Sequence, residues 1–436
     1  MSSILIFFIV FAGILIVGIA AYRRTEWFLY LYLLGLPFDH VTFTVGPMRV
    51  SVSDFALVAL LVSWLMRFFF KGEQRLCYPV QVYLGLMLMI FVVGATMRNF
   101  ETIEGVRLSF SFIVKICSYF LLLQFIRNEK ELTKSIKMIM IGAGLATLLA
   151  IYQQYAFISG GMPKLKTVMM EGAVSGLNYN FPYAPLRPLA GMNHSAAFGS
   201  YLTFPLALLL GIFFFRMPLK YRLWALIPTI LMFLVLVMND TRAAYFSILI
   251  SFLICMMLGN NKLRYSLFVL LMMAPILIVP VYEFLFFHRE TSVATRQEVL
   301  PIVFEFALQN PLGGGILFFQ KTNEMQLGAH SSFLQMLTFG GIPAMLIYLY
   351  ILVSIFFQFR KSFNGIWSIR DNYPMRYAFI IILSAIFVGA LITSELVHPR
   401  TTNKDHWAFL AIFFLTPLFS EAAVEDEKRI KFENST

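Results

Sequence analysis

The stretch Ser331–Phe357 reads SSFLQMLTFGGIPAMLIYLYILVSIFF and contains no charged residue. An α-helix needs about 20 predominantly apolar residues to cross the roughly 30 Å hydrocarbon core of a bilayer. This stretch is therefore long enough to cross a membrane. Whether it is a single anchor or one of many spans depends on the rest of the chain.

Apolar runs of similar length recur along nearly the whole sequence. Of the 436 residues, 59% are hydrophobic and only 13% are charged, with a mean hydropathy of +0.77. A soluble globular chain carries about 25% charged residues. The composition therefore indicates a polytopic membrane protein. No long polar block could form a separate soluble domain, so we expect one integral membrane domain over residues 1–436.

Thirteen apolar segments can be counted, and they predict an all-α protein with about 12–13 transmembrane helices. The second segment is short and could be re-entrant or tilted, which would make the count twelve. Because Arg23 and Arg24 follow the first segment, we expect a retained anchor with its N-terminus outside. The segments lie near residues 4–21, 26–37, 52–67, 79–97, 106–126, 138–158, 193–215, 223–238, 243–258, 265–286, 331–357, 377–396 and 407–420.

The distribution of Lys and Arg predicts the orientation of these helices. Of 34 basic residues, 21 fall in the loops and tail on one side, 12 fall on the other, and Lys115 lies inside a span. Cytoplasmic loops carry the excess of Lys and Arg, so the first side, with the tail 421–436, is predicted to be cytoplasmic. The outer, non-cytoplasmic side then contains two long loops, 159–192 and 287–330. Long loops of this kind are where binding and catalysis tend to reside.

Charge and cysteine placement argue against two other features. The net charge of +11 comes from short loops between spans rather than from one basic patch, so nucleic acid is not an expected partner. None of the three cysteines, Cys77, Cys117 and Cys255, is predicted to lie in an outer loop. We therefore expect no disulfide bond.

The first of three polar motifs on the predicted outer side ends the first long loop. Residues Pro185–Leu202 read PLRPLAGMNHSAAFGSYL. Arg187 ends the loop, and Asn193 or Ser195, on either side of His194, could cap the following helix. Taken alone, this pattern is explained somewhat better by an interfacial Arg beside a helix cap than by a functional site.

The second motif joins two spans through a very short link. Residues Val237–Ser247 read VMNDTRAAYFS. Asp240 or Thr241 could cap the next helix, and Arg242 would stand in its first turn. A cation there opposes the positive end of the helix dipole, and Arg normally prefers the cytoplasmic side. Arg242 is thus unfavourably placed for two reasons, and a functional role for it is as well supported as a role as an interface anchor.

The third motif follows the second long loop. We expect a short amphipathic helix near 293–309, then a flexible turn at Gly313–Gly315, and then His330 and Ser331 at the start of the apolar run. No Gly-Lys-Ser/Thr follows the glycines, so they do not form a nucleotide-binding loop. A lone His at a membrane interface is most often a packed or capping residue, so His330 by itself does not establish catalysis.

Several common types of catalytic site can be excluded because the sequence lacks their motifs. The sequence has no His-Glu-x-x-His, no paired Cys, no Gly-x-Ser-x-Gly and no Asp-rich metal–diphosphate motif. Neither a metal nor another cofactor is therefore expected. Arg and His remain: a guanidinium binds phosphate bidentately and is always charged, and an imidazole accepts protons near neutral pH. Together they suit a phosphate leaving group and a hydroxyl nucleophile.

In this arrangement the chain resembles the O-antigen ligase/polymerase superfamily of bacterial membranes. Three segments carry the resemblance: GMNHSAAFGSYL with Arg187 before it, TRAAYFS, and HSSFLQMLTFGGIPA after a loop containing NPLGGGILF. The ligase signature is His, then Asn, Ser or Gln, nine residues, Gly, two residues, and finally Gly, Thr or Tyr. His330, Ser331 and Gly341 fit it. Ala344 departs from its last position, which weakens the choice of ligase over polymerase.

The resemblance implies a GT-C-like glycosyltransferase of lipopolysaccharide biosynthesis, multi-pass in the bacterial inner membrane, with its active site facing the periplasm. A ligase transfers a glycan from undecaprenyl diphosphate to lipid A-core, among membrane lipids and without a divalent metal. Carried onto this chain, Arg187 and Arg242 would hold the diphosphate, and His330 would act on the acceptor hydroxyl. Further glycan or phosphate contacts are expected from Arg289, Arg296, His194, Asn193, Asp240 and Ser331.

Two other functions stay open at this point. An O-antigen or exopolysaccharide polymerase of the same superfamily would use the same donor and transfer the glycan to the next lipid-linked glycan. A transporter or flippase of lipid-linked glycans is the alternative from a different class. Transport paths usually place ionisable residues at mid-membrane depth, and here only Lys115 is clearly placed that way. We therefore expect a membrane glycosyltransferase.

Overall fold

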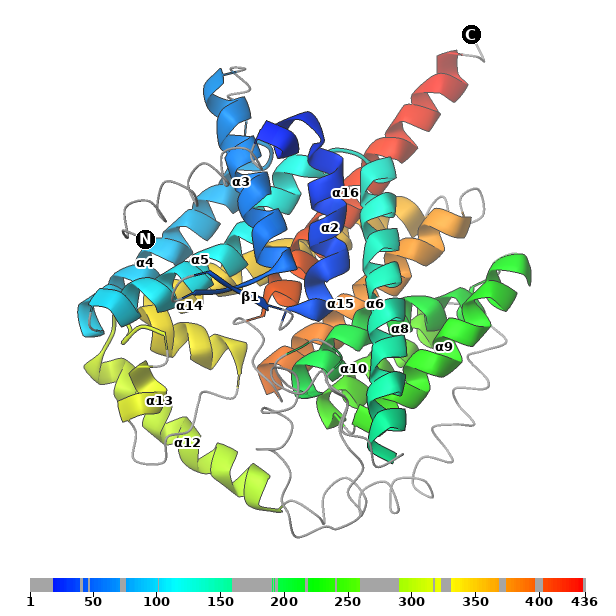
Figure 1. The fold of residues 1–436 in the computed structure, drawn as a ribbon. Coiled ribbons are helices and arrows are strands. Elements are labelled where there is room, and N and C mark those ends of the chain that lie inside the picture. Colours follow the sequence, from blue (N-terminus) through cyan, green and yellow to red (C-terminus); the bar gives the residue numbers. More distant parts are fainter. Residues whose placement is uncertain are drawn as a thin grey trace.

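Figure 1 shows the chain as a bundle of long helices, with the C-terminal helix passing through its middle. The structure is a computed structural model. It describes residues 19–39, 42–45, 48–70, 76–100, 102–158, 190, 192, 195–215, 219–239, 241–258, 290–316, 318–322, 331–367, 374–396 and 403–433.

Most predicted apolar segments are helices at the expected places. Within the described residues, six helices are long and apolar enough to cross a membrane. The predicted helical, polytopic membrane fold is thereby confirmed, while the segments 4–21 and 265–286 lie almost entirely outside the described residues. The matching helices are α2 (Thr25–Gly35), α3 (Val52–Phe70), α4 (Pro79–Asn99), α5 (Thr102–Phe125), α6 (Glu129–Ile158), α8 (Ser195–Phe214), α9 (Leu219–Asn239), α10 (Arg242–Leu258), α14 (Ser332–Trp367), α15 (Pro374–Leu396) and α16 (Lys404–Glu433).

The second predicted segment is shorter than a span. α2 has 11 residues and rises about 16 Å, roughly half the hydrocarbon thickness, before it continues into the 3-10 helix η1 (Leu36–Phe38). A two-stranded antiparallel hairpin follows, formed by β1 (Thr42–Val45) and β2 (Met48–Ser51), with Thr42 opposite Ser51. This hairpin is a small departure from the all-α expectation, and it brings Ser51 to the start of α3.

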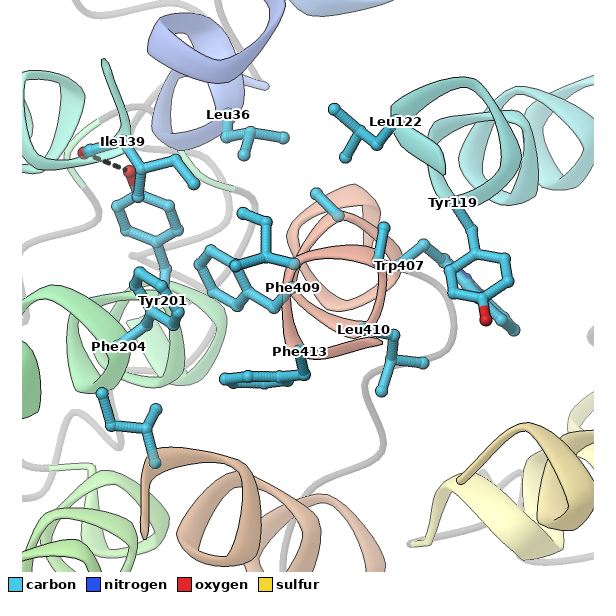
Figure 2. Close-up of a cluster of buried hydrophobic side chains, with 14 of the residues drawn as sticks. Leu36, Tyr119, Leu122, Ile139, Tyr201, Phe204, Trp407, Phe409, Leu410 and Phe413 are labelled. Carbon is cyan, nitrogen blue, oxygen red and sulfur yellow. Dashed lines mark hydrogen bonds between the residues drawn. The ribbon is translucent and has the colours of Figure 1, made fainter. Parts of the chain in front are cut away.

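α16 is the core of the bundle. Its residues 404–417 are all buried, and Figure 2 shows its side chains pointing outward to several surrounding helices. Phe409 stacks on Phe204 of α8 with ring centroids 4.5 Å apart, and Trp407 meets Tyr119 of α5 edge-on at 6.4 Å. A helix that is apolar all round is a buried helix. The last predicted span is thus the central one, a position that its sequence alone did not reveal.

The apolar run 331–357 forms two helices rather than the one long helix expected. Within α14, Gly341 has φ 74° and ψ −165°, and Pro343 lacks the amide hydrogen that a continuous helix would use. The rings of Phe333 and Tyr348 lie 5.5 Å apart, although straight helix would separate these positions by about 22 Å. Residues 332–340, which we call the short segment of α14, therefore fold back onto the rest of the helix.

The short segment is covered by the helix that the second long loop was predicted to contain. α12 (Glu290–Gln309) includes the predicted range 293–309, and α13 (Phe318–Thr322) follows it. Val299, Val303 and Ala307 of α12 are buried in one cluster with Leu337 of the short segment. α12 thus packs along the part of the chain that directly follows His330 in sequence.

Candidate functional site

The start of α8 lies against the start of α10. A Cβ atom at Gly199 of α8 would stand 2.5 Å from Oδ1 of Asn239 and 2.7 Å from Cβ of Thr241. Real Cβ atoms do not approach other atoms this closely, so glycine is what allows the contact. The first and second predicted motifs therefore begin their helices side by side.

The start of α14 lies at the same end of the bundle. α10 packs against α15 so closely that a Cβ at Gly389 would stand 2.4 Å from the carbonyl oxygen of Ser247. Further along α15, the carbonyl of Ser394 accepts a hydrogen bond of 3.4 Å from the hydroxyl of Ser332. We call the end where α8, α10 and α14 begin the motif end.

Arg242 is the first residue of α10, and the link before it is as short as predicted. α9 ends at Asn239. The carbonyl of Thr241 accepts hydrogen bonds from the amides of Ala244 (3.0 Å) and Tyr245 (3.3 Å), which puts Thr241 at the N-cap. Its hydroxyl donates to the side-chain oxygen of Asn239. The backbone thus holds Arg242 in the first helical turn, where the sequence placed it.

Ser331 caps the short segment of α14. Its Oγ accepts a hydrogen bond from the amide of Leu334 at 3.1 Å, and its carbonyl accepts one from the amide of Gln335 at 2.9 Å. This is the usual pattern of a serine N-cap. Because Ser331 takes the capping role, that explanation is no longer needed for His330, the residue before it.

The glycine turn lies where it was predicted and holds the break in α14. The amides of Gly314 and Gly315 donate to the carbonyls of Thr338 (2.9 Å) and Phe339 (2.8 Å), in the last turn before Gly341. Carbonyls at the end of a helix lack hydrogen-bond donors within the helix, and here the amides of the glycine turn are those donors. The sequence predicted a flexible turn at these glycines. In the structure the backbone of the turn is instead held by hydrogen bonds to the short segment.

The end of α4 fixes the other side of the glycine turn. Two side chains donate to its carbonyls, and one hydroxyl accepts from its backbone. The three contacts are Arg98 Nη2 to the Gly313 carbonyl (2.8 Å), Asn99 Nδ2 to the Gly314 carbonyl (3.1 Å), and the Ile316 amide to Thr96 Oγ1 (3.0 Å).

Several predicted site residues lie outside the described residues: Arg187, Asn193, His194, Asp240, Arg289 and His330. Arg242 and Arg296 belong to α10 and α12, whose backbones are described. The segment that follows Arg187 is tied to α6. The side chain of Gln153 donates to the carbonyl of Ala190 at 2.9 Å and accepts from its amide at 3.0 Å.

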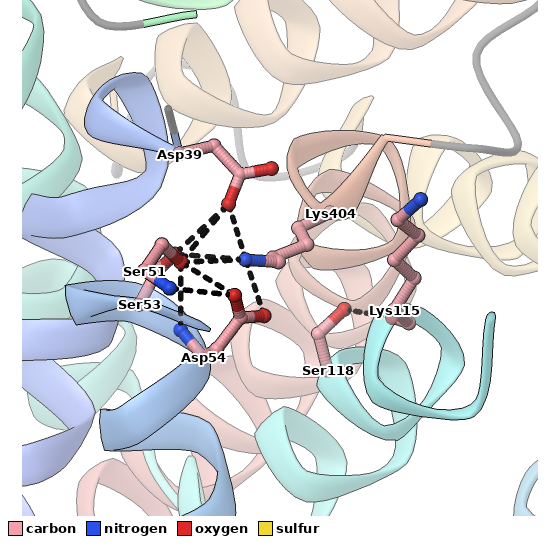
Figure 3. Close-up of polar contacts among 7 residues, drawn as sticks. All are labelled: Asp39, Ser51, Ser53, Asp54, Lys115, Ser118 and Lys404. Carbon is pink, nitrogen blue, oxygen red and sulfur yellow. Dashed lines mark hydrogen bonds and ion pairs between the residues drawn. The ribbon is translucent and has the colours of Figure 1, made fainter. Parts of the chain in front are cut away.

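A buried charge cluster at the start of α16 was not predicted. Lys404 is only 5% exposed, and its ammonium pairs with the carboxylates of Asp39 and Asp54, the latter at 2.5 Å. It also donates to the hydroxyls of Ser51 and Ser53 at 2.9 Å and 3.0 Å, as Figure 3 shows. We call these five residues the Lys404 cluster.

The Lys404 ammonium stabilises the charged carboxylates of this cluster, and Lys115 adds a smaller attraction to Asp39. Burial alone would raise the pKa of Asp39, but the Lys404 ammonium outweighs burial and holds this pKa below its usual value. Burial would lower the pKa of Lys404, and the two carboxylates raise it above its usual value instead. The cation between the carboxylates is therefore a lysine. Within the described part of the chain, no three His, Cys, Asp or Glu side chains gather as metal ligands would.

Part of this cluster left a local signal in the sequence. The amide of Asp54 donates to Ser51 Oγ at 3.0 Å, and the amide of Ser51 donates to Asp54 Oδ2 at 2.9 Å. This reciprocal pair resembles a capping box, which a Ser-x-x-Asp pattern before an apolar run can indicate. Lys404 lies 365 positions after Asp39, and no local pattern could have paired them.

The first turn of α16 also faces the start of α14. Nε2 of His406 and Oη of Tyr348 are 3.0 Å apart and buried, and the ring of Tyr348 contacts Phe333 in the short segment. His406 and Ser394 line one small cavity between α14, α15 and α16. The start of α16, with the Lys404 cluster, thus lies at the motif end, and His406 is a second polar residue there that the sequence did not single out.

Comparison with known proteins identifies one family domain in the chain. Residues 227–349 match the model of the O-antigen ligase family; no match was found among curated proteins. The matched region includes the α9–α10 link, the glycine turn and the break in α14, and begins after Arg187. Members of the family are membrane glycosyltransferase-like enzymes, with lipid-linked glycan and lipid A-core substrates in general. Residues 227–349 of this multi-pass membrane chain are thus similar to the O-antigen ligase family, which supports the predicted resemblance to the O-antigen ligase/polymerase superfamily.

Proposed function

We propose that the chain is an O-antigen ligase-like glycosyltransferase. It transfers a glycan from undecaprenyl diphosphate to a hydroxyl of lipid A-core on the periplasmic face of the bacterial inner membrane, without a metal. The observation that carries this proposal is the common position of the starts of α10 and α14 inside the family domain. Arg242 opens the first helix, and His330 directly precedes the cap of the second.

In the proposed reaction the acceptor oxygen attacks the anomeric carbon as the bond from that carbon to the diphosphate oxygen breaks. An imidazole with a pKa of about 6.5 cannot deprotonate a sugar hydroxyl beforehand. His330 therefore takes the proton as the new bond forms and releases it to solvent afterwards. Arg187 and Arg242 stabilise the negative charge that grows on the departing undecaprenyl diphosphate.

The scaffold around the short segment supports a catalytic His330. Ser331 fills the cap position, and the glycine turn fixes the other end of the segment. Leu337 packs on α12, and Phe333 packs on Tyr348. A catalytic group has to be held within about 1 Å of its productive position, and a segment secured on four sides meets this need.

A polymerase of the same superfamily is the second candidate, because Ala344 stands where the ligase signature has Gly, Thr or Tyr. Ala344 is buried, and its Cβ lies 2.6 Å from where a Cβ on Gly340 would be. This position therefore packs the break in α14. A polymerase would use the same donor and the same residues but transfer the glycan to the next lipid-linked unit.

Reconstitution with both acceptors tests the proposal. The purified protein receives an undecaprenyl-diphosphate-linked glycan together with lipid A-core and a second lipid-linked unit, and the products are identified by mass spectrometry. A ligase yields glycan on lipid A-core. A polymerase yields elongated lipid-linked glycan instead. Movement of the donor across a vesicle membrane with neither product would contradict a glycosyltransferase and indicate a flippase.

A further inference from the structure

Lys115 lies on the face of α5 that meets both the short segment of α14 and the start of α16. Phe112, one turn before it, contacts Phe339 of the short segment with ring centroids 6.5 Å apart. Tyr119, one turn after it, contacts Trp407 of α16 at 6.4 Å. Residues three and four positions apart share a helix face. Lys115 is therefore directed to the region between these two elements.

Along this face of α5, the side chains become less exposed from Ser111 through Lys115 to Ser118. α5 begins beside the end of α4, which holds the glycine turn. Ser111 is exposed, Lys115 is half-buried, and Ser118 is fully buried. The ammonium of Lys115 is thus placed where a ligand arriving from the motif end would meet the buried interior of the bundle.

Among the described residues the ammonium of Lys115 makes no direct ion pair, unlike that of Lys404, although Asp39 and Asp54 attract it from further away. Asp39 and Asp54 both pair with Lys404. Figure 3 shows the Lys115 side chain beside this cluster, with its ammonium pointing away from the two carboxylates. Among the described residues, no hydrogen bond or ion pair reaches that ammonium. An ionisable residue inside a span is costly and usually serves a function.

We propose that Lys115 binds a phosphate group of a lipid-linked substrate, as a third cation in addition to Arg187 and Arg242. This inference rests on the proposed function and names one more contact of the same site. A half-buried ammonium that makes no direct ion pair in the described part of the chain is stabilised by an incoming anion, and an ammonium suits phosphate as a point charge. The N-terminal end of α16 adds a favourable partial positive charge nearby. The phosphate belongs either to the donor diphosphate or to a phosphorylated acceptor core.

A pair of substitutions distinguishes a binding lysine from a structural one. Lys115→Met removes only a longer-range attraction to Asp39 and Asp54, so the free protein should unfold close to the temperature of wild type. Lys404→Met leaves two buried carboxylates unpaired and should unfold at a clearly lower temperature. Lys137 is an exposed lysine in the first half of α6. Lys137→Met is therefore the control substitution and should change neither stability nor binding.

Binding is measured on the purified full chain with two probes, a short-chain polyprenyl diphosphate and a lipid A-core with or without its phosphates. Loss of one charge-assisted contact should weaken binding of one probe by about tenfold to a hundredfold in Lys115→Met, and Lys115→Arg should retain most of it. The probe that weakens identifies the source of the phosphate. The binding assay requires no transfer, so its result stands apart from the proposed activity. Unchanged binding of both probes, or a Lys115→Met protein as unstable as Lys404→Met, would overturn the inference.

Discussion

Gly341→Ala should misplace the short segment of α14 and with it the residues that precede it. Gly341 has φ 74°, in the left-handed region. A Cβ there would lie 2.1 Å from the carbonyl oxygen of Pro311 and 2.6 Å from the amide nitrogen of Gly313. Both are backbone atoms, one in the glycine turn that α4 holds in place and one two residues before it, so they cannot yield as a flexible side chain would.

The magnitude follows from these contacts. A left-handed backbone costs an L-residue about 1–2 kcal/mol. Moving the Pro311 carbonyl also breaks its 3.0 Å hydrogen bond from the amide of Ile342, which contributes about 0.5–1.5 kcal/mol. Together these effects lower the free energy of unfolding by about 1.5–3.5 kcal/mol. A shift of about 1 Å at a catalytic group lowers the rate by about 100-fold, so transfer should fall further than stability.

Gly94→Ala is the matched control. Gly94 lies in α4, and a Cβ there meets no atom within 4 Å, so the change should raise helix stability by up to about 1 kcal/mol. Both variants are compared by thermal unfolding in detergent and by single-turnover glycan transfer. If Gly341→Ala has the same unfolding temperature and transfer rate as Gly94→Ala, the break in α14 at Gly341 does not position the site, and the reasoning is refuted.

Three further outcomes are expected. Thr96→Val removes the acceptor for the glycine turn and should lower transfer more than Thr416→Val, an equally buried helical threonine in α16; equal rates would contradict the role of α4. Arg242→Lys keeps the charge but loses the planar fork, so transfer should fall by about 10²–10³-fold with normal membrane insertion, whereas normal transfer would make Arg242 an interface anchor. The lowered pKa of Asp39 and the raised pKa of Lys404 should keep stability level at neutral pH. Stability should fall below about pH 4 and above about pH 10 in thermal unfolding scans, and a maximum confined to acidic pH would refute the ion pair.

Local patterns in the sequence were enough to predict where most helices lie and which polar residues stand at their starts. Arg242 was placed in a first turn because two apolar runs meet at a four-residue polar link, and α10 does begin there. α12 was predicted from a loop segment that is too polar for a span but helical in pattern. In both cases the deciding information lies within about ten neighbouring residues.

Features that depend on distant partners were not predictable. The break in α14 had a visible cause in Gly341 and Pro343, yet a helix can carry both residues with only a kink. Its sharp reversal depends on the amides of Gly314 and Gly315. In the same way, an apolar segment near the C-terminus does not reveal whether lipid or protein surrounds it, and residues 404–417 of α16 are buried because other helices pack around them.

The most direct test of the proposed mechanism is the rate of glycan transfer by His330→Asn. Asn cannot accept the proton from the acceptor hydroxyl, while Ser331 still caps the short segment. We therefore predict a protein that inserts normally, binds the undecaprenyl-diphosphate donor as wild type does, and transfers about 10²–10⁴-fold more slowly, with a chelator present throughout. Transfer by His330→Asn at nearly the wild-type rate would contradict a proton-accepting role for His330.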